Sequence, residues 1–419
     1  MRRSSPLPLA LPVAVAVALA SAVAVGGAAP AFATTTGPGG GAPAPGPARA
    51  APGLDRAALR EAIAVGRDDG ATGVVAKVTK GEETWRGASG DVVSGHRVSR
   101  DAHFRIGSIS KPMEAVILLQ LSAEGGVDLD RSVQHYLPGL LPEGRFKEPV
   151  SVRQLLNHTS GLPQDFEGDP AVPSRDEEIE RRLDYLTFDE IIRRTLRPEG
   201  RPAPGPRFSP GTRQEYNSFG YRVAGKLIEE ISGHSYRYEV THRILEPLRM
   251  RQTKAAVPYR ATPVPRPYLA GYLPRSNGEL VDVHMQGGLP ASMTSTTGDL
   301  DRFIRGMLDG SLLRPAQTSE LFAIPKGIDG KPLPFVGDSH CNTGPGRGTA
   351  CFSVGLMSTP LPDGSVLWGK TGSDPGYRSG VFASRDLHLR AVYAVGTSSS
   401  SVNPAAAVSQ RLALAAFAR

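Results

Sequence analysis

The sequence predicts a mixed fold of the α/β class in its α+β form. We expect an antiparallel sheet built from both chain ends and flanked by helices, with a helical region inserted between the two parts. Strand-like stretches occur near both ends of the folded chain, whereas helical signals dominate the middle. Hydrophobic residues make up 40% of the 419 residues, which is enough for a sizeable core. The folded domain is predicted over 54–419, with a sheet part at about 54–121 and 288–419 and a helical part at about 122–287.

The first residues have the features of an export signal. Residues 1–33 combine a positively charged start, an apolar stretch over 9–25 and the small-x-small pattern Ala31-Phe32-Ala33. Residues 34–53 form a Pro/Gly-rich linker that cannot bury a core. We therefore expect a secreted, extracellular protein, released or loosely associated with the cell wall, without a stable membrane anchor.

The first part of the domain contains a short helix, a hairpin and a buried helix. Asp55 is a candidate N-cap, and 73–80 and 83–89 have the composition of two strands. A helix is expected from Ser108 to about Glu124, ended by two glycines. Its segment 115–119 is apolar on all sides, which indicates a helix in the middle of the protein.

Helices and then strands follow towards the C-terminus. Ser151 begins a capping box, and 223–231 and 299–308 have helical patterns. Four strands and a final helix are then expected, at Phe352–Met357, Ser365–Thr371, Ser379–Ser384, His388–Gly396 and from Asn403-Pro404 onwards.

Charge, histidines and cysteines exclude several classes of function. The formal net charge of +7 is spread along the chain, so we expect no nucleic-acid partner. The nine histidines show no metal-ligand spacing, so we expect no metal and no cofactor. The two cysteines, Cys341 and Cys351, are predicted to form a disulfide, as two nearby cysteines in an exported protein commonly do.

Ser108 and Lys111 form the first candidate catalytic pair. Residues three apart share one helix face, so the lysine amine can reach the serine hydroxyl. A lysine activates a serine when burial leaves the amine neutral, and a helix start favours an oxyanion. Taken alone, the pair is better explained by an N-capping serine and a surface lysine.

Lys370-Thr371-Gly372 is a second motif, followed by Ser373. It ends a predicted strand and offers a cation, hydroxyls and backbone N–H groups to an extended acyl substrate. The segment 364–371 also matches the phosphate-binding pattern G-x-x-x-x-G-K-[ST]. We reject that interpretation because strand-forming residues fill the loop and no helix can start after it.

Tyr216-Asn217-Ser218 is the third motif. A phenol between a serine and two lysines can relay a proton to a leaving group, although alone it is explained by a core tyrosine. The chain contains no Gly-x-Ser-x-Gly elbow, which disfavours an α/β-hydrolase.

The three motifs together resemble the serine penicillin-recognising enzymes, which include class C β-lactamases, low-molecular-weight D-Ala-D-Ala carboxypeptidases and related esterases. Their order and spacing fit, and flanking segments at 104–108, 154–162 and 369–377 are similar as well. The resemblance runs from about residue 54 to the C-terminus and implies a β-lactamase/transpeptidase-like fold. It also implies that His158 and Ser160 are structural loop residues.

The resemblance implies a role for each motif residue. Ser108 would be the acylated nucleophile, Lys111 its general base and Tyr216 the proton relay. The backbone N–H groups of Ser108 and Ser373 would form the oxyanion hole. The substrate-binding residues would be Lys370, Thr371, Ser373, Asn217 and Ser218, with Lys370 and Thr371 meeting a substrate carboxylate.

Two departures from the family pattern leave the substrate open. The second motif is usually Tyr-x-Asn, but here Ser218 takes the third place and Asn217 comes one residue early. The strand over 353–357 offers no arginine for a terminal carboxylate, and Lys370 is the expected substitute.

We expect a monomeric secreted serine acyl-enzyme hydrolase, foremost a D-Ala-D-Ala carboxypeptidase acting on peptidoglycan-type peptides. The alternatives are a class C-type β-lactamase, an esterase, and a non-catalytic protein that binds muropeptides or penicillin. The substrate would thus be a small peptide, a β-lactam or an ester, with cell-wall peptidoglycan as a candidate partner.

Overall fold

The structure is a computed structural model. It describes residues 53–66, 70–90, 97–142, 144–167, 174–337, 340–341, 346–361, 364–398 and 404–417. The predicted signal peptide and almost all of the predicted linker lie outside these residues. None of the helices in the described ranges is both long and apolar enough to cross a bilayer.

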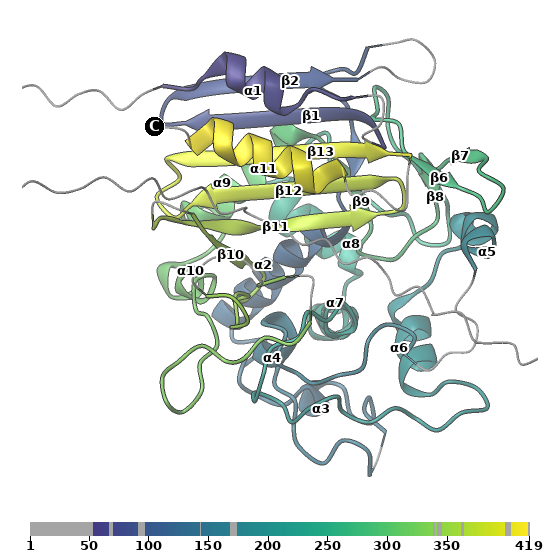
Figure 1. The fold of residues 1–419 in the computed structure, drawn as a ribbon. Helices are drawn as coiled ribbons and strands as arrows, with labels where there is room; N and C mark the ends of the chain where they lie inside the picture. The colour runs from purple at the N-terminus through teal and green to yellow at the C-terminus, as the bar shows by residue number, and fades with distance from the viewer. Residues whose placement is uncertain are drawn as a thin grey trace, which may run out of the picture.

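A six-stranded antiparallel sheet joins the two ends of the folded chain (Figure 1). The N-terminal hairpin pairs with the last strand, and Val75 lies opposite Ala394. This arrangement confirms the predicted fold class. In spatial order the strands are β10 (Met357–Pro360), β11 (Val366–Asp374), β12 (Tyr377–Ser384), β13 (Leu389–Thr397), β1 (Ala71–Lys80) and β2 (Glu83–Ser89).

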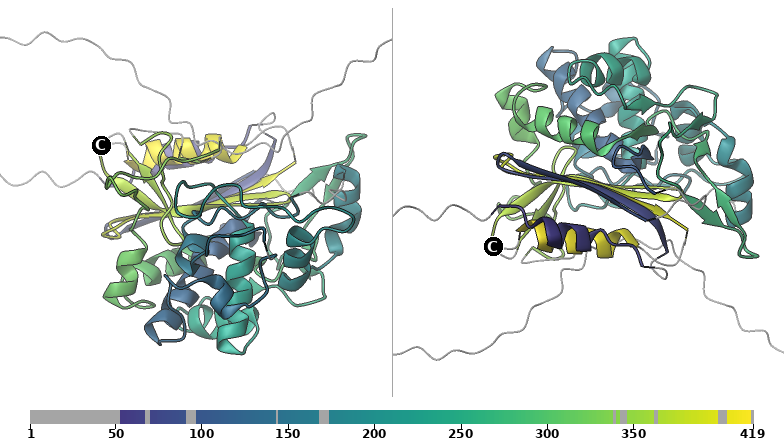
Figure 2. Two further views of the ribbon diagram at one scale, coloured as in Figure 1. Left: turned by 90° about the horizontal axis from the view of Figure 1, so that it is seen from below. Right: turned by 90° about the horizontal axis from the view of Figure 1, so that it is seen from above.

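Helices cover both faces of the sheet (Figure 2). The terminal helices α1 (Arg56–Ala62) and α11 (Pro404–Phe417) lie together on one face. As predicted, the carboxylate of Asp55 caps α1 by accepting hydrogen bonds from two backbone N–H groups. Leu59 of α1 and Leu412 of α11 are buried in one apolar cluster with Val74 and Val395 of the sheet.

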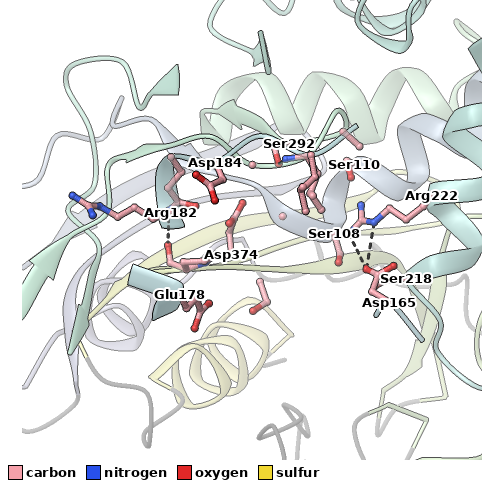
Figure 3. Close-up of a pocket in the computed structure, with 18 of the residues that line it drawn as sticks. Ser108, Ser110, Asp165, Glu178, Arg182, Asp184, Ser218, Arg222, Ser292 and Asp374 are labelled. Carbon is pink, nitrogen blue, oxygen red and sulfur yellow. Dashed lines mark hydrogen bonds and ion pairs between the residues drawn. The ribbon is translucent and has the colours of Figure 1, made fainter. Parts of the chain in front are cut away.

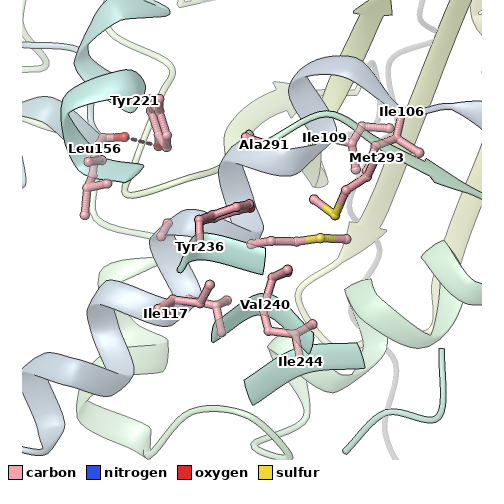
Figure 4. Close-up of a cluster of buried hydrophobic side chains, with 14 of the residues drawn as sticks. Ile106, Ile109, Ile117, Leu156, Tyr221, Tyr236, Val240, Ile244, Ala291 and Met293 are labelled. Carbon is pink, nitrogen blue, oxygen red and sulfur yellow. Dashed lines mark hydrogen bonds between the residues drawn. The ribbon is translucent and has the colours of Figure 1, made fainter. Parts of the chain in front are cut away.

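The helix α2 (Ser110–Ala123) runs through the core on the other side of the sheet (Figure 4). A 3-10 turn, η1 (Gly107–Ile109), precedes it, so the predicted helix begins with a tighter turn. Every residue over 110–119 is buried, which includes the segment 115–119 whose all-round apolar pattern predicted burial. Burial on all sides fixes the start of this helix, which carries Lys111 and directly follows the turn that carries Ser108.

The inserted region holds most of the remaining helices, together with short strands that the sequence did not predict. Its helices pack chiefly around α7, which contacts α2, α4 and α6. The helices are α3 (Val133–Tyr136), α4 (Val152–Leu156), α5 (Arg175–Glu180), η2 (Arg181–Leu183), α6 (Phe188–Leu196), α7 (Phe219–Ser232), α8 (Tyr236–Val240) and η3 (Thr241–Leu245), and further on α9 (Thr297–Leu308) and α10 (Pro315–Glu320).

The short strands form three small sheets. One sheet holds β3, β9 and β4, and the two others each pair two strands, β5 with β8 and β6 with β7. Their bounds are β3 (Phe104–Arg105), β4 (Lys254–Ala255), β5 (Thr262–Pro263), β6 (Tyr272–Pro274), β7 (Leu280–Asp282), β8 (Met285–Gln286) and β9 (Met293–Ser295).

One predicted strand, Phe352–Met357, is wrong. The strand β10 begins only at Met357, and the preceding residues form a turn packed on α2. The Ser353 hydroxyl donates to the carbonyls of Leu321 and Leu356. At Gly355 φ is 85°, and a Cβ there would lie 2.7 Å from the Ala115 Cβ. This tertiary contact, rather than local propensity, sets the backbone.

Candidate active site

Ser108 and Lys111 meet at the start of the central helix. The Lys111 Nζ donates a hydrogen bond to the Ser108 Oγ over 3.1 Å. Lys111 is buried, and both residues line a cavity. The structure therefore places a cation beside a hydroxyl that substrate can reach.

Tyr216 approaches the same hydroxyl from the inserted region, just before α7. Its hydroxyl donates to the Ser108 Oγ over 2.9 Å. The Tyr216 ring packs against the rings of His158, His340 and Phe352, with centroids 4.7, 4.6 and 5.4 Å away. The packing of these rings holds the Tyr216 hydroxyl against Ser108.

Two lysines surround the Tyr216 ring. The Nζ atoms of Lys111 and Lys370 lie 5.5 and 4.7 Å from its centroid. Burial raises the pKa of Tyr216, but the two ammonium groups and the hydrogen bond with Ser108 lower it to about 7. An ionised Tyr216 can therefore accept the Ser108 proton near neutral pH.

The nearby imidazoles add no positive charge. Burial, followed by the charges of Lys111 and Lys370, lowers the pKa of His158 well below its usual value. The same causes lower the pKa of His340 to about 3. Both rings are thus neutral near pH 7 and act by packing.

The end of β11 lies directly against η1. At Gly107 φ is 50°, and a Cβ there would lie 2.4 Å from the Ser373 carbonyl oxygen. A Cβ on Gly372 would lie 1.9 Å from the Ile106 carbonyl oxygen. Only glycines permit this approach, which brings the backbones of Ser108 and Ser373 together. The two predicted oxyanion-hole residues therefore lie on adjoining segments.

Lys370 lies behind Tyr216. Its side chain is buried, and its Nζ donates to the Thr371 carbonyl over 2.9 Å. Burial lowers the pKa of Lys370, which the phenol of Tyr216 partly offsets. Lys370 and Thr371, like Tyr216 itself, are not among the described residues that line the cavity beside Ser108. The position of Lys370 suits control of Tyr216 better than contact with a substrate carboxylate.

A cavity of about 560 Å³ opens beside Ser108 (Figure 3). The end of β11 forms one wall, and α5, η2 and the loop around Asp165 form others. Its charged residues are Lys111, Asp165, Glu178, Arg181, Arg182, Asp184, Arg194, Arg222 and Asp374.

Asn217 has a different role from the predicted one. Its Nδ2 donates to the carbonyls of Leu162 and Pro163 over 2.8 and 2.9 Å, and its Oδ1 accepts from the Gly220 N–H over 2.7 Å. The buried amide thus holds a loop and the start of α7. Ser218, not Asn217, lines the cavity, in line with its place in the usual Tyr-x-Asn pattern.

The cysteine segment, meaning the residues at the Cys341–Cys351 disulfide, packs against Tyr216. Cys341 and Cys351 form a disulfide, and the Gln214 Oε1 accepts hydrogen bonds from the N–H groups of Cys351 and Phe352. His340 precedes the disulfide and stacks on Tyr216. No role in the site was predicted for His340, or for the charged residues around the cavity other than Lys111. Among these residues, only His340 had a local signal in the sequence, which is its position beside Cys341.

His158 and Ser160 lie in a buried loop, as the resemblance implied. The His158 Nδ1 accepts a hydrogen bond from the Asn217 N–H over 3.1 Å. The Ser160 hydroxyl accepts one from the Leu162 N–H over 3.3 Å. Both residues support the segment that carries Tyr216.

Known proteins resemble this chain over most of its length. Residues 56–416 match the family model described as Beta-lactamase. Esterase EstB of Burkholderia gladioli is 30% identical over 330 residues, covering 72% of this chain and 80% of the esterase. The D-stereospecific amidohydrolase from Streptomyces sp. has a TM-score of 0.70 and 28% identity, covering 87% of this chain and 99% of that one. The D-amino acid amidase from Ochrobactrum anthropi SV3, solved with L-phenylalanine, has a TM-score of 0.66 and 25% identity, covering 86% and 97%.

Proposed function

The chain belongs to the β-lactamase family and is a serine hydrolase, and we propose that it cleaves small amides and esters through an acyl-enzyme formed on Ser108. The observation that carries this proposal is the convergence of Lys111 and Tyr216 on the Ser108 Oγ, over 3.1 and 2.9 Å. The amidase and esterase relatives support the two substrate classes.

The reaction begins when Tyr216, in its ionised form, takes the proton of Ser108. The serine oxygen then attacks the substrate carbonyl, whose oxygen is held by the N–H groups of Ser108 and Ser373. Tyr216 passes the proton to the leaving amine or alcohol, and water releases the acyl group in the reverse sequence. The two lysines beside Tyr216 favour this assignment over Lys111 as the base.

A D-Ala-D-Ala carboxypeptidase acting on peptidoglycan-type peptides is the narrower candidate. It is favoured by the resemblance of the three motifs, but its substrate carries a carboxylate that needs a cation. Lys370, the predicted cation, is buried and bonded to the Thr371 carbonyl. A leaving group without a carboxylate therefore fits this site better.

Export is part of the same proposal. We propose that residues 1–33 are removed as a signal peptide and that the enzyme is released or stays loosely associated with the cell wall. The sequence pattern of this segment supports export. The disulfide is also suited to an oxidising compartment.

The test is hydrolysis of three substrates by the wild type and Ser108→Ala: a neutral aryl ester, an amino acid anilide and an acyl-D-Ala-D-Ala peptide. Loss of the nucleophile should lower kcat by about 10⁴-fold or more on every substrate that the wild type cleaves. Ser110→Ala is the matched control, because the Ser110 hydroxyl contacts Glu114 rather than the catalytic groups. Full ester and amide turnover by Ser108→Ala would overturn the proposal, and cleavage of the peptide alone would favour the carboxypeptidase.

A further inference from the structure

Asp374 is a carboxylate in the cavity wall that directly follows Ser373. In Figure 3 it lies with Ser108 on one side and Asp184 on the other. Within the part of the chain that the structure describes, its carboxylate makes no hydrogen bond or ion pair. A charged group beside the nucleophile is thus left without a fixed partner.

The other acidic residues of the cavity are paired. Asp165 lies 3.2 Å from Arg222, Asp184 lies 3.1 Å from Arg181, and Glu178 lies 3.6 Å from Arg175. Asp374 therefore differs from them in its bonding, because none of the described residues forms an ion pair with it.

Three arginines near Asp374 are bonded to other groups. The Arg105 Nη2 donates to the Thr262 carbonyl over 2.5 Å, and the Arg378 Nη1 donates to the backbone carbonyls of Asp374 and Tyr377 over 3.0 and 2.8 Å. The third, Arg222, is paired with Asp165. Burial raises the pKa of Asp374, while the charges of Arg105, Arg378 and Arg222 oppose that rise. A substrate cation would supply the close contact that none of the three arginines makes.

The proposed acylation places the substrate next to this carboxylate. With its carbonyl oxygen between the N–H groups of Ser108 and Ser373, the acyl group would lie against the part of the cavity wall that Ser373, Asp374 and Pro375 form. We propose that Asp374 binds an ammonium group on the α-carbon of the acyl part, so that the preferred substrates are amides or esters of amino acids with a free α-amino group. This inference rests on the proposed function.

The test compares Asp374→Asn with the wild type on two anilides, alanine p-nitroanilide and its des-amino analogue, propionyl p-nitroanilide. A charge-assisted contact is worth about tenfold to a hundredfold in specificity. We expect kcat/KM of Asp374→Asn to fall by that factor on the ammonium substrate and to change less than about threefold on the des-amino one. Asp184→Asn is the control, because it removes the same charge from the same cavity at a residue already paired with Arg181.

The outcomes separate this inference from the proposed function. Equal losses on both anilides, or equal effects of Asp374→Asn and Asp184→Asn, would overturn the ammonium site while Ser108-dependent hydrolysis still stands. Wild-type enzyme that prefers the des-amino anilide would overturn it as well. If Ser108→Ala retains ester hydrolysis, the proposed function itself fails. Thermal unfolding of each variant shows whether a loss reflects the site or the fold.

Discussion

The charge around Tyr216 decides the pH at which its hydroxyl holds a proton. Burial alone would favour the neutral phenol, but Lys111 and Lys370 on either side bring the pKa down to about 7. The deprotonated form is the one that accepts the serine proton, so activity should rise with pH through about 7 and then level off.

Lys370→Met should shift this pH dependence. Removing one ammonium group raises the pKa of Tyr216, so the acid limb of kcat/KM moves to higher pH. With a neutral aryl ester we expect a loss of about tenfold at pH 6 that shrinks towards pH 9. The measurement is kcat/KM against pH for the variant and the wild type.

Lys226→Met is the control for this shift, because Lys226 is a lysine of α7 paired with Asp189 at 3.1 Å, away from Tyr216. If Lys370→Met lowers kcat/KM by the same factor at every pH, Lys370 does not set the pKa of Tyr216. A loss confined to an acyl-D-Ala-D-Ala peptide would instead show that Lys370 holds a substrate carboxylate.

At the scale of elements, local signals were sufficient where the contact itself is local. The i,i+3 spacing of Ser108 and Lys111 and the N-cap at Asp55 act within one helix turn, and the structure shows both contacts. The predicted strand at 352–357 failed because Gly355 packs on α2, far away in sequence. Local signals also could not predict that the Asp374 carboxylate lacks a partner among the described residues, because this depends on the direction of the Arg105 side chain, which donates to the Thr262 carbonyl.

The start of α7 depends on the Asn217 amide. Asn217→Ala would leave the buried carbonyls of Leu162 and Pro163 and the Gly220 N–H without this partner. We expect the free energy of unfolding to fall by about 3 kcal/mol. Ser218→Ala, one residue along and facing the cavity, should change it by less than about 0.5 kcal/mol. Urea unfolding distinguishes the two, and equal midpoints would show that the amide does not hold this loop.

At the scale of the whole molecule, the site exists only when distant parts of the chain meet. Ser108 comes from the N-terminal part, Tyr216 from the inserted region, and Ser373 and Asp374 from the C-terminal strands (Figure 1). The pairing of β1 with β13 joins the N-terminal part of the chain to the C-terminal strands in one sheet. Sequence motifs could predict which residues meet, but the cavity charges belong to loops whose positions depend on this assembly.

The disulfide connects this global arrangement to Tyr216. It joins residues ten apart in sequence, and His340 beside it stacks on the phenol, so its loss should both destabilise the fold and open this side of the site. In the chain-entropy model a loop of this size contributes about 3 kcal/mol to the free energy of unfolding.

We expect dithiothreitol to lower the stability of the wild type by about that amount in urea unfolding. It should also move the acid limb of ester hydrolysis to higher pH. Water that reaches Tyr216 weakens both the effect of burial and that of the two lysines, and because the lowering of the pKa is the larger of the two, the pKa returns towards its ordinary value near 10. The Cys341→Ala/Cys351→Ala double variant is the matched control: it should show both changes without reductant and no response to it. Since neither Cys341 nor Cys351 is among the described residues that line the cavity, the preference between ammonium and des-amino anilides should stay the same. A change in that preference would mean that the cysteine segment shapes the substrate pocket directly, rather than acting through Tyr216.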